Sequence, residues 1–163
     1  VLLGRLYIRK GKDQFWFWNK NKWAEKGLAL MDEAVSENPT HVIFRYERAL
    51  YTCQMPSFFK RWKSAENDLD TIMLLFQNSD TDTILKDWQS WQAFNSVFLK
   101  NITTDDVKLV CLKQRVYYYA GILHYKLRNY AISKDMMKRV ISFDPNSSYG
   151  LYAFLWLNTT VFK

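Results

Sequence analysis

Apolar residues recur every three to four positions along most of this 163-residue chain, and that spacing restricts the fold more than any other feature. Between Trp23 and Glu37, for example, residues 24, 28, 31, 34 and 35 form one apolar stripe opposite mostly charged positions. Such a stripe is typical of an amphipathic helix. Five glycines and three prolines are too few for the frequent turns of a β-sandwich or a barrel. The sequence therefore predicts an all-α fold.

Start and stop signals divide the chain into seven or eight helices within a single domain, residues 1–163. Pro39 and Pro145 each end a helix, because the residue before a proline is driven out of the α region. Asp and Thr residues at 80–82 and at 103–106 are good N-caps for two helices, reaching about 100 and about 127. The other predicted helices cover residues 2–11, 23–37, 41–54, 60–76, 129–144 and 147–161.

The segment 117–145 reads YYYAGILHYKLRNYAISKDMMKRVISFDP and has the residue types of a helical hairpin. Gly121 and Ser133 would let its two helices approach closely. Tyr130 would fill the gap between the helices, and Pro145 would end the second one. The segment resembles a tetratricopeptide repeat, a helix-turn-helix unit of about 34 residues.

Residues 1–39 resemble the same repeat, with Gly4 and Gly27 as the small residues and Pro39 at the end. The resemblance implies a right-handed superhelix of antiparallel helical hairpins, similar to divergent bacterial tetratricopeptide-like proteins without an assigned role. The implied units are residues 1–39, 40–77, a degenerate 78–111, and 112–145, with a capping helix at 147–161.

In such repeats the ligand usually lies in a concave groove lined by the first helix of each pair. The resemblance places in that groove Arg45, Tyr46, Arg48, Arg115, Tyr118, Tyr125 and Lys126. Guanidinium groups pair well with carboxylates, and tyrosines are effective contact residues, so this set suits a peptide. We expect a non-catalytic scaffold that binds a protein or peptide of unknown identity. A solvated helix face is the alternative interpretation of the same residues.

Two stretches combine aromatic and basic residues: DQFWFWNKNKW at 13–23 and QMPSFFKRW at 54–62. Both are interpreted as insertions at the turn between the helices of a repeat, which stacking would bring to one edge. Four consecutive aromatic residues cannot all face inward from one helix, so they either pack beneath a loop or form an interaction edge. The edge would comprise Trp16, Trp18, Lys20, Lys22, Trp23, Phe58, Phe59, Arg61 and Trp62. It would serve the alternative function, binding a membrane surface or an anionic ligand.

Charge and motifs exclude several other function classes. Much of the net charge of +7 comes from residues 1–30, whereas nucleic-acid binders spread basic charge along a face, so nucleic acid is not an expected partner. No nucleotide, acyl-transfer or metal motif occurs. We expect no catalytic residue, no cofactor and no metal. Cys53 and Cys111 are expected to be free thiols, with a disulfide left open as the alternative, and the acidic residues at 66–70 are expected to face water. A cytoplasmic location is favoured, with an upstream signal or anchor left open.

Overall fold

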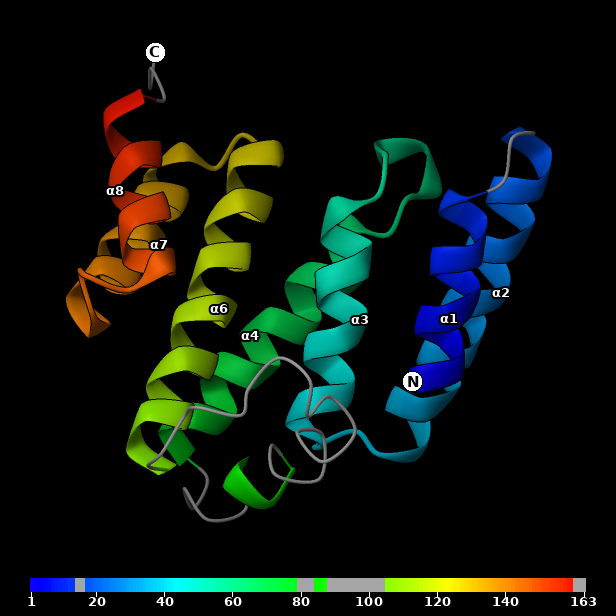
Figure 1. Cartoon of the computed structure of the whole chain (residues 1–163), viewed down its shortest axis with the longest axis horizontal. Helices are drawn as coiled ribbons and strands as arrows, with labels where there is room; N and C mark the ends of the chain where they lie inside the picture. Colours follow the sequence, from blue (N-terminus) through cyan, green and yellow to red (C-terminus); the bar gives the residue numbers. More distant parts are fainter. Residues whose placement is uncertain (14–16, 79–83, 88–104, 160–163) are drawn as a thin grey trace.

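The computed structural model describes residues 1–13, 17–78, 84–87 and 105–159. Its helices are α1 (Leu2–Lys12), α2 (Phe17–Glu37), α3 (Val42–Gln54), the 3-10 helix η1 (Ser57–Phe59), α4 (Trp62–Asn78), α6 (Asp105–Lys126), α7 (Tyr130–Phe143) and α8 (Ser148–Thr159), with a further helical turn at 84–87. All regular structure in these ranges is helical, as Figure 1 shows. The predicted all-α class is confirmed.

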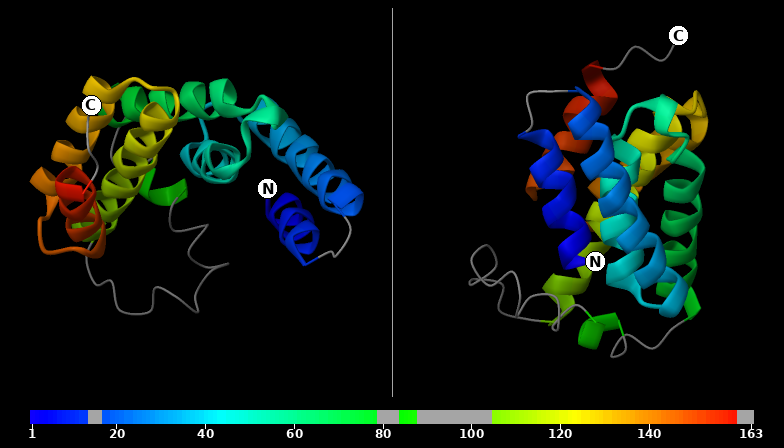
Figure 2. Two further views of the ribbon diagram at one scale, coloured as in Figure 1. Left: turned by 90° about the horizontal axis from the view of Figure 1, so that it is seen from above. Right: turned by 90° about the vertical axis from the view of Figure 1, so that its right-hand side faces the viewer.

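Helices that follow one another in the chain pack as pairs: α1 on α2, α3 on α4, and α6 on α7. The pairs also contact one another, α2 against α3 and α4 against α6, and α8 packs on α7. Viewed from above in Figure 2, they follow a curve, with α1, α3 and α6 on its inner side and α2, α4 and α7 on its outer side. The inner face is therefore built from helices that are distant in sequence.

Glycines lie at the points where paired helices cross. A Cβ atom on Gly27 would lie 2.6 Å from the Gly4 carbonyl oxygen, and one on Gly4 would lie 2.6 Å from the Gly27 carbonyl oxygen. The backbones of α1 and α2 thus touch, which only a residue without a side chain allows. At the α6–α7 crossing, Ser133 Oγ donates a hydrogen bond to the Gly121 carbonyl oxygen over 2.6 Å. The expectation that these three glycines lie at helix crossings is confirmed.

The expected role of Tyr130 is wrong. Its side chain is 38% exposed, and its ring lies beside that of Tyr125, with the centroids 5.4 Å apart. The gap between α6 and α7 is filled by Met137, which is fully buried and whose side chain lies against Gly121. Tyr130 is the first residue of α7 and lies at the end of the crossing rather than at its centre.

The largest buried cluster lies between α3, α4 and α6. Ala65, Leu69 and Ile72 are its contribution from α4, and Trp62 and Phe76 pack against it from the two ends of that helix. A second cluster lies between α1, α2 and the end of α3. In it, Ile8 of α1 and Leu28 and Met31 of α2 meet Met55, which follows α3. The two clusters fix the positions of the helices on the inner side of the curve.

The predicted boundary of the second helix is wrong. Residues 17–22 were expected in an inserted loop before a helix at 23–37, but they form the first turns of α2. Trp23 stacks on Tyr7 of α1, with centroids 5.1 Å apart, and Lys10 Nζ lies 4.2 Å from the Trp23 ring centroid. These contacts continue the α1–α2 pairing towards the connection between the helices. The end of the helix predicted to reach residue 100, and residue 161 of the last predicted helix, lie outside the described residues.

Candidate functional site

The arginines of α3 that were expected in the groove bind carboxylates of the same chain. Arg45 Nη1 donates to Asp68 Oδ1 over 2.8 Å, and Arg48 donates to both Asp68 oxygens over 2.7 and 2.8 Å. Asp32 accepts from Arg48 over 2.9 Å and from Arg61 over 2.7 Å. Asp68 is fully buried, so the expectation that it faces water is wrong; the two guanidinium groups compensate its charge. These three arginines therefore stabilise the packing of α2, α3 and α4.

Tyr46 was also expected in the groove, but it is only 2% exposed and cannot contact a partner. Its ring packs edge-on against Tyr119, and burial raises the pKa of Tyr46 well above its ordinary value. Arg115 is hydrogen-bonded to Tyr46 and lies 5.6 Å from the Tyr149 ring centroid. Tyr118 is half-buried, with its ring 5.3 Å from that of Tyr149. Arg115 and Tyr118 thus belong to a tyrosine cluster that joins α3, α6 and α8.

The last two residues expected in the groove lie in the final turn of α6 and also have partners. Tyr125 packs edge-on against Trp156, with centroids 5.3 Å apart. Lys126 Nζ donates to the Cys53 carbonyl oxygen over 2.7 Å, at the C-terminal end of α3, where the helix dipole favours a cation. The Lys126 ammonium also lies 5.6 Å from the Trp62 ring centroid. These contacts attach the end of α6 to α3, α4 and α8.

Some of the residues expected at the aromatic and basic edge pack within the fold, and others are exposed to solvent. Trp16 lies outside the described residues, and only the backbone of Trp18 is described, in the first turn of α2. Trp62 Nε1 donates to the Met55 carbonyl oxygen over 2.8 Å, so this side chain anchors the connection after α3. Phe58 is 57% exposed and stacks on Phe59. The remaining members of the set, Lys20 and Lys22, are exposed on α2, and Trp23 and Arg61 have the contacts given above.

An open groove of about 620 Å³ lies between α1, α3 and α6. These three helices are on the inner side of the curve in Figure 2. We call this hollow the inner groove; its lining comprises Arg5, Arg9, Lys12, Asp13, Leu50, Tyr51, Gln54 and Tyr119. Residues 5, 9 and 12 share one face of α1 because they are spaced four and three positions apart. Arg5 Nε lies 3.2 Å from the buried Glu47 carboxylate. Arg9 and Lys12 are exposed, and neither pairs with a carboxylate in the part of the chain that the structure describes.

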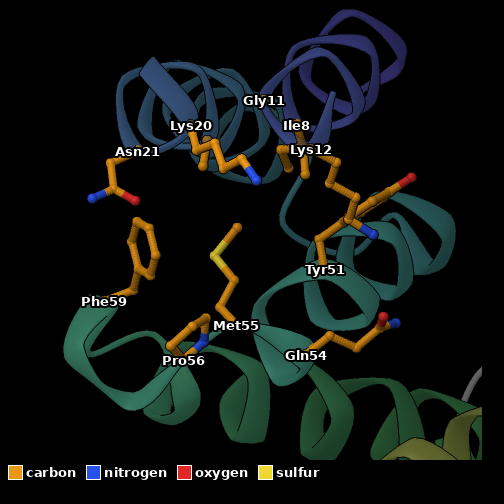
Figure 3. Close-up of a pocket in the computed structure, with 11 residues that line it drawn as sticks. Ile8, Gly11, Lys12, Lys20, Asn21, Tyr51, Gln54, Met55, Pro56 and Phe59 are labelled. Atoms are coloured by element: carbon orange, nitrogen blue, oxygen red, sulfur yellow. The ribbon is translucent and has the colours of Figure 1, made fainter. Parts of the chain in front are cut away.

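A smaller pocket of about 230 Å³ adjoins the inner groove, between α1, α2 and the segment that follows α3 (Figure 3). We call it the apolar pocket, because its walls come largely from Ile8, Ala24, Met55, Pro56 and Phe59. Polar side chains surround its opening: Lys12, Lys20, Asn21, Tyr51 and Gln54. The two hollows share Lys12, Tyr51 and Gln54 and so form one surface. Residues of both aromatic stretches, Lys20 and Phe59, contribute to this pocket.

Gly11 allows α1 and α2 to come together beside the apolar pocket. A Cβ atom at this position would lie 3.0 Å from the Lys20 carbonyl oxygen and 3.3 Å from Trp23 Cβ. Figure 3 shows the Met55 side chain extending towards the centre of the pocket, with Lys20 on the α2 side and Phe59 beside it. The pocket is therefore formed by packed helices and not by a single loop.

Sequence reasoning missed the residues that line these hollows on α1 and late in α3. The family resemblance implied other positions of the first helices as the groove. It therefore did not include Arg9, Lys12, Tyr51 or Gln54. A signal was present, since the spacing of residues 5, 9 and 12 places three cations on one helix face. What the sequence could not show is which cations have carboxylate partners within the fold.

Within the described ranges, no three His, Cys, Asp or Glu side chains lie together as a metal site would require. No described helix combines the length and apolar character needed to cross a bilayer. Cys53 and Cys111 are free thiols, as expected; burial raises the pKa of Cys53 to about 12, which keeps the thiol protonated. Comparisons with models of known protein families, with curated proteins and with solved structures find no match to this chain.

Proposed function

We propose that this chain is a non-catalytic scaffold that binds a segment of a partner protein in the inner groove. The observation that carries the proposal is the pair of exposed cations on α1, Arg9 and Lys12, which have no carboxylate partner in the described ranges. By contrast, Arg45, Arg48 and Arg61 all pair with aspartates of the chain. Cations that remain unpaired beside a groove favour a partner that brings its own carboxylates.

The packing of the helices also supports a binding scaffold. The groove is lined by three helices that buried clusters hold in place, so its shape exists before a partner arrives, and most of the ordering on binding falls on the partner segment. Tyr51 and Tyr119 offer aromatic contact area beside the cations. The glycine crossings and the curved row of helix pairs are the further support for a tetratricopeptide-like arrangement, which we include in the proposal.

Selection from a random peptide display library tests this function. The wild-type protein should enrich peptides, and Arg9→Glu should lose them, because it reverses a groove charge without altering a buried contact. Lys138→Glu is the matched control, since Lys138 is exposed and belongs to α7, a helix that does not line the inner groove. Failure to enrich any peptide, or enrichment of the same peptides by Arg9→Glu, would contradict the proposal.

The exposure of Phe58 favours a second candidate, binding to a membrane surface or an anionic ligand through residues 13–23 and 54–62. Two of the tryptophans expected to serve this function, Trp23 and Trp62, already have partners within the fold. Sedimentation with anionic lipid vesicles at low salt distinguishes the two functions. Binding that is lost in Phe58→Ala and retained in Arg9→Glu would favour the second candidate.

A further inference from the structure

We infer that the partner segment is acidic and carries one large apolar side chain, which it inserts into the apolar pocket. The carboxylates of the segment contact Lys12 and Lys20 at the pocket and Arg9 in the inner groove. This inference rests on the proposed function and specifies the chemistry of the partner. It is drawn from the adjacency of two hollows of different character, one apolar and one basic, that share Lys12, Tyr51 and Gln54.

The size of the apolar pocket selects a side chain rather than a small molecule. Its volume of about 230 Å³ is below the range of roughly 300–1,000 Å³ usual for small-molecule sites. One aromatic or branched aliphatic side chain suits such a space. Binding energy at protein interfaces is typically concentrated in a few anchors of this kind, seated in well-packed pockets.

The walls of the apolar pocket are formed in advance by the fold. Ile8 and Met55 are 4% and 8% exposed and belong to the second buried cluster, between α1, α2 and the end of α3. Tyr51 and Phe59 also pack against this cluster. The hydrogen bond from Trp62 Nε1 to the Met55 carbonyl oxygen fixes the backbone on one side. An entering side chain therefore meets an apolar surface that the fold has already assembled, which lowers the ordering needed on binding.

The positive charges around the two hollows indicate which residues of the partner segment should flank the apolar anchor. Lys20 lies on the α2 side of the pocket, Lys12 lies between the pocket and the groove, and Arg9 lies in the groove. All three are exposed, and none pairs with a carboxylate among the described residues. Asp13 is the one acidic residue in the described linings of the two hollows. Aspartate or glutamate on both sides of the anchor would complement this arrangement.

Fluorescence anisotropy with three labelled peptides tests the inference. The first has one central phenylalanine flanked by aspartates and glutamates; the second replaces the phenylalanine by serine; the third replaces the acidic residues by their amides. The wild-type protein should bind the first peptide at least about tenfold more tightly than the second, since burial of one phenyl group supplies a factor of that order. It should also bind the first more tightly than the third, and this difference should shrink as salt is added.

Variants place the effect at the apolar pocket. Asn21→Trp puts a bulky side chain at the opening and should abolish the preference for phenylalanine over serine, whereas Asn67→Trp, on the exposed face of α4, should retain it. Lys20→Glu should weaken both acidic peptides, whereas Lys22→Glu, exposed on the same helix but not lining the pocket, should not. Equal binding of the phenylalanine and serine peptides by the wild type, or an unchanged preference in Asn21→Trp, would overturn the inference.

The outcomes separate this inference from the function on which it rests. If both acidic peptides bind equally and Arg9→Glu weakens both, the groove binds peptides and the inserted anchor is refuted. If no acidic peptide binds and display selection also enriches none, the proposed function and the inference both fail. If the uncharged phenylalanine peptide binds as tightly as the acidic one, the acidic character of the partner is refuted.

Discussion

Removal of the Asp68 carboxylate should destabilise the fold far more than removal of a carboxylate from an exposed ion pair. The Asp68 carboxylate is fully buried and accepts three hydrogen bonds from Arg45 and Arg48, whose side chains are each only 12% exposed. Asp68→Ala leaves these two guanidinium groups without their main counter-charge, although Arg48 retains Asp32. Loss of one partner from a buried ion pair typically costs about 3–5 kcal/mol. That is a large part of the stability of about 5–15 kcal/mol usual for a domain.

Urea denaturation followed by circular dichroism measures this effect. With a slope near 2 kcal/mol/M, the midpoint for Asp68→Ala should fall by about 1.5–2.5 M. Asp135→Ala is the matched control, because Asp135 pairs with Arg139 over 2.9 Å on α7 with both side chains about half exposed. The control should change stability by less than about 0.5 kcal/mol. Midpoints for the two variants within experimental error of each other would refute the reasoning.

Three further perturbations follow from particular contacts. Gly27→Ala should lower the free energy of unfolding in urea titrations by about 1–3 kcal/mol, because the new methyl group would collide with the backbone of α1. Gly121→Ala should lower it less, because its methyl group would meet only the flexible side chain of Met137. Arg128→Gly should raise the thermal midpoint, because Arg128 has a φ of 64° after α6, a left-handed conformation that glycine adopts without steric strain. The gain in the free energy of unfolding should be about 1 kcal/mol. A lower midpoint would contradict this. The free energy of unfolding should fall as pH rises above about 9, because folded Cys53 keeps its proton until about 12 while the unfolded chain releases it; Cys53→Ala should show a shallower decline.

The helices could be predicted largely because their signals are local. Apolar periodicity, the proline after residue 38 and the acidic N-caps near 105 depend on neighbours in sequence, and the observed bounds of α3, α4, α6 and α7 follow them closely. The start of α2 was missed because aromatic residues with lysines between them read as a loop. Residues 17–22 extend the helix that holds Trp23 against Tyr7 of α1, and that contact depends on how α1 and α2 pair.

The candidate site was less predictable, because it depends on which charges find partners in three dimensions. Arg48 and Arg9 are the same residue type on inner helices, yet Arg48 binds Asp68 and Asp32 whereas Arg9 is exposed. The sequence places Asp68 in an acidic run that resembles a solvated face, and nothing local marks it as buried. The apolar pocket likewise arises where α1, α2 and the end of α3 meet, so no single segment encodes it.

Backbone amide chemical shifts, recorded while the acidic phenylalanine peptide is added, test most directly whether the inner groove and the apolar pocket are the binding surface. We expect the largest changes at the end of α1 near Arg9 and Lys12, at Tyr51 and Gln54 of α3, and at Phe59. Changes concentrated on the outer helices α4 and α7, or no saturable change at all, would contradict the account.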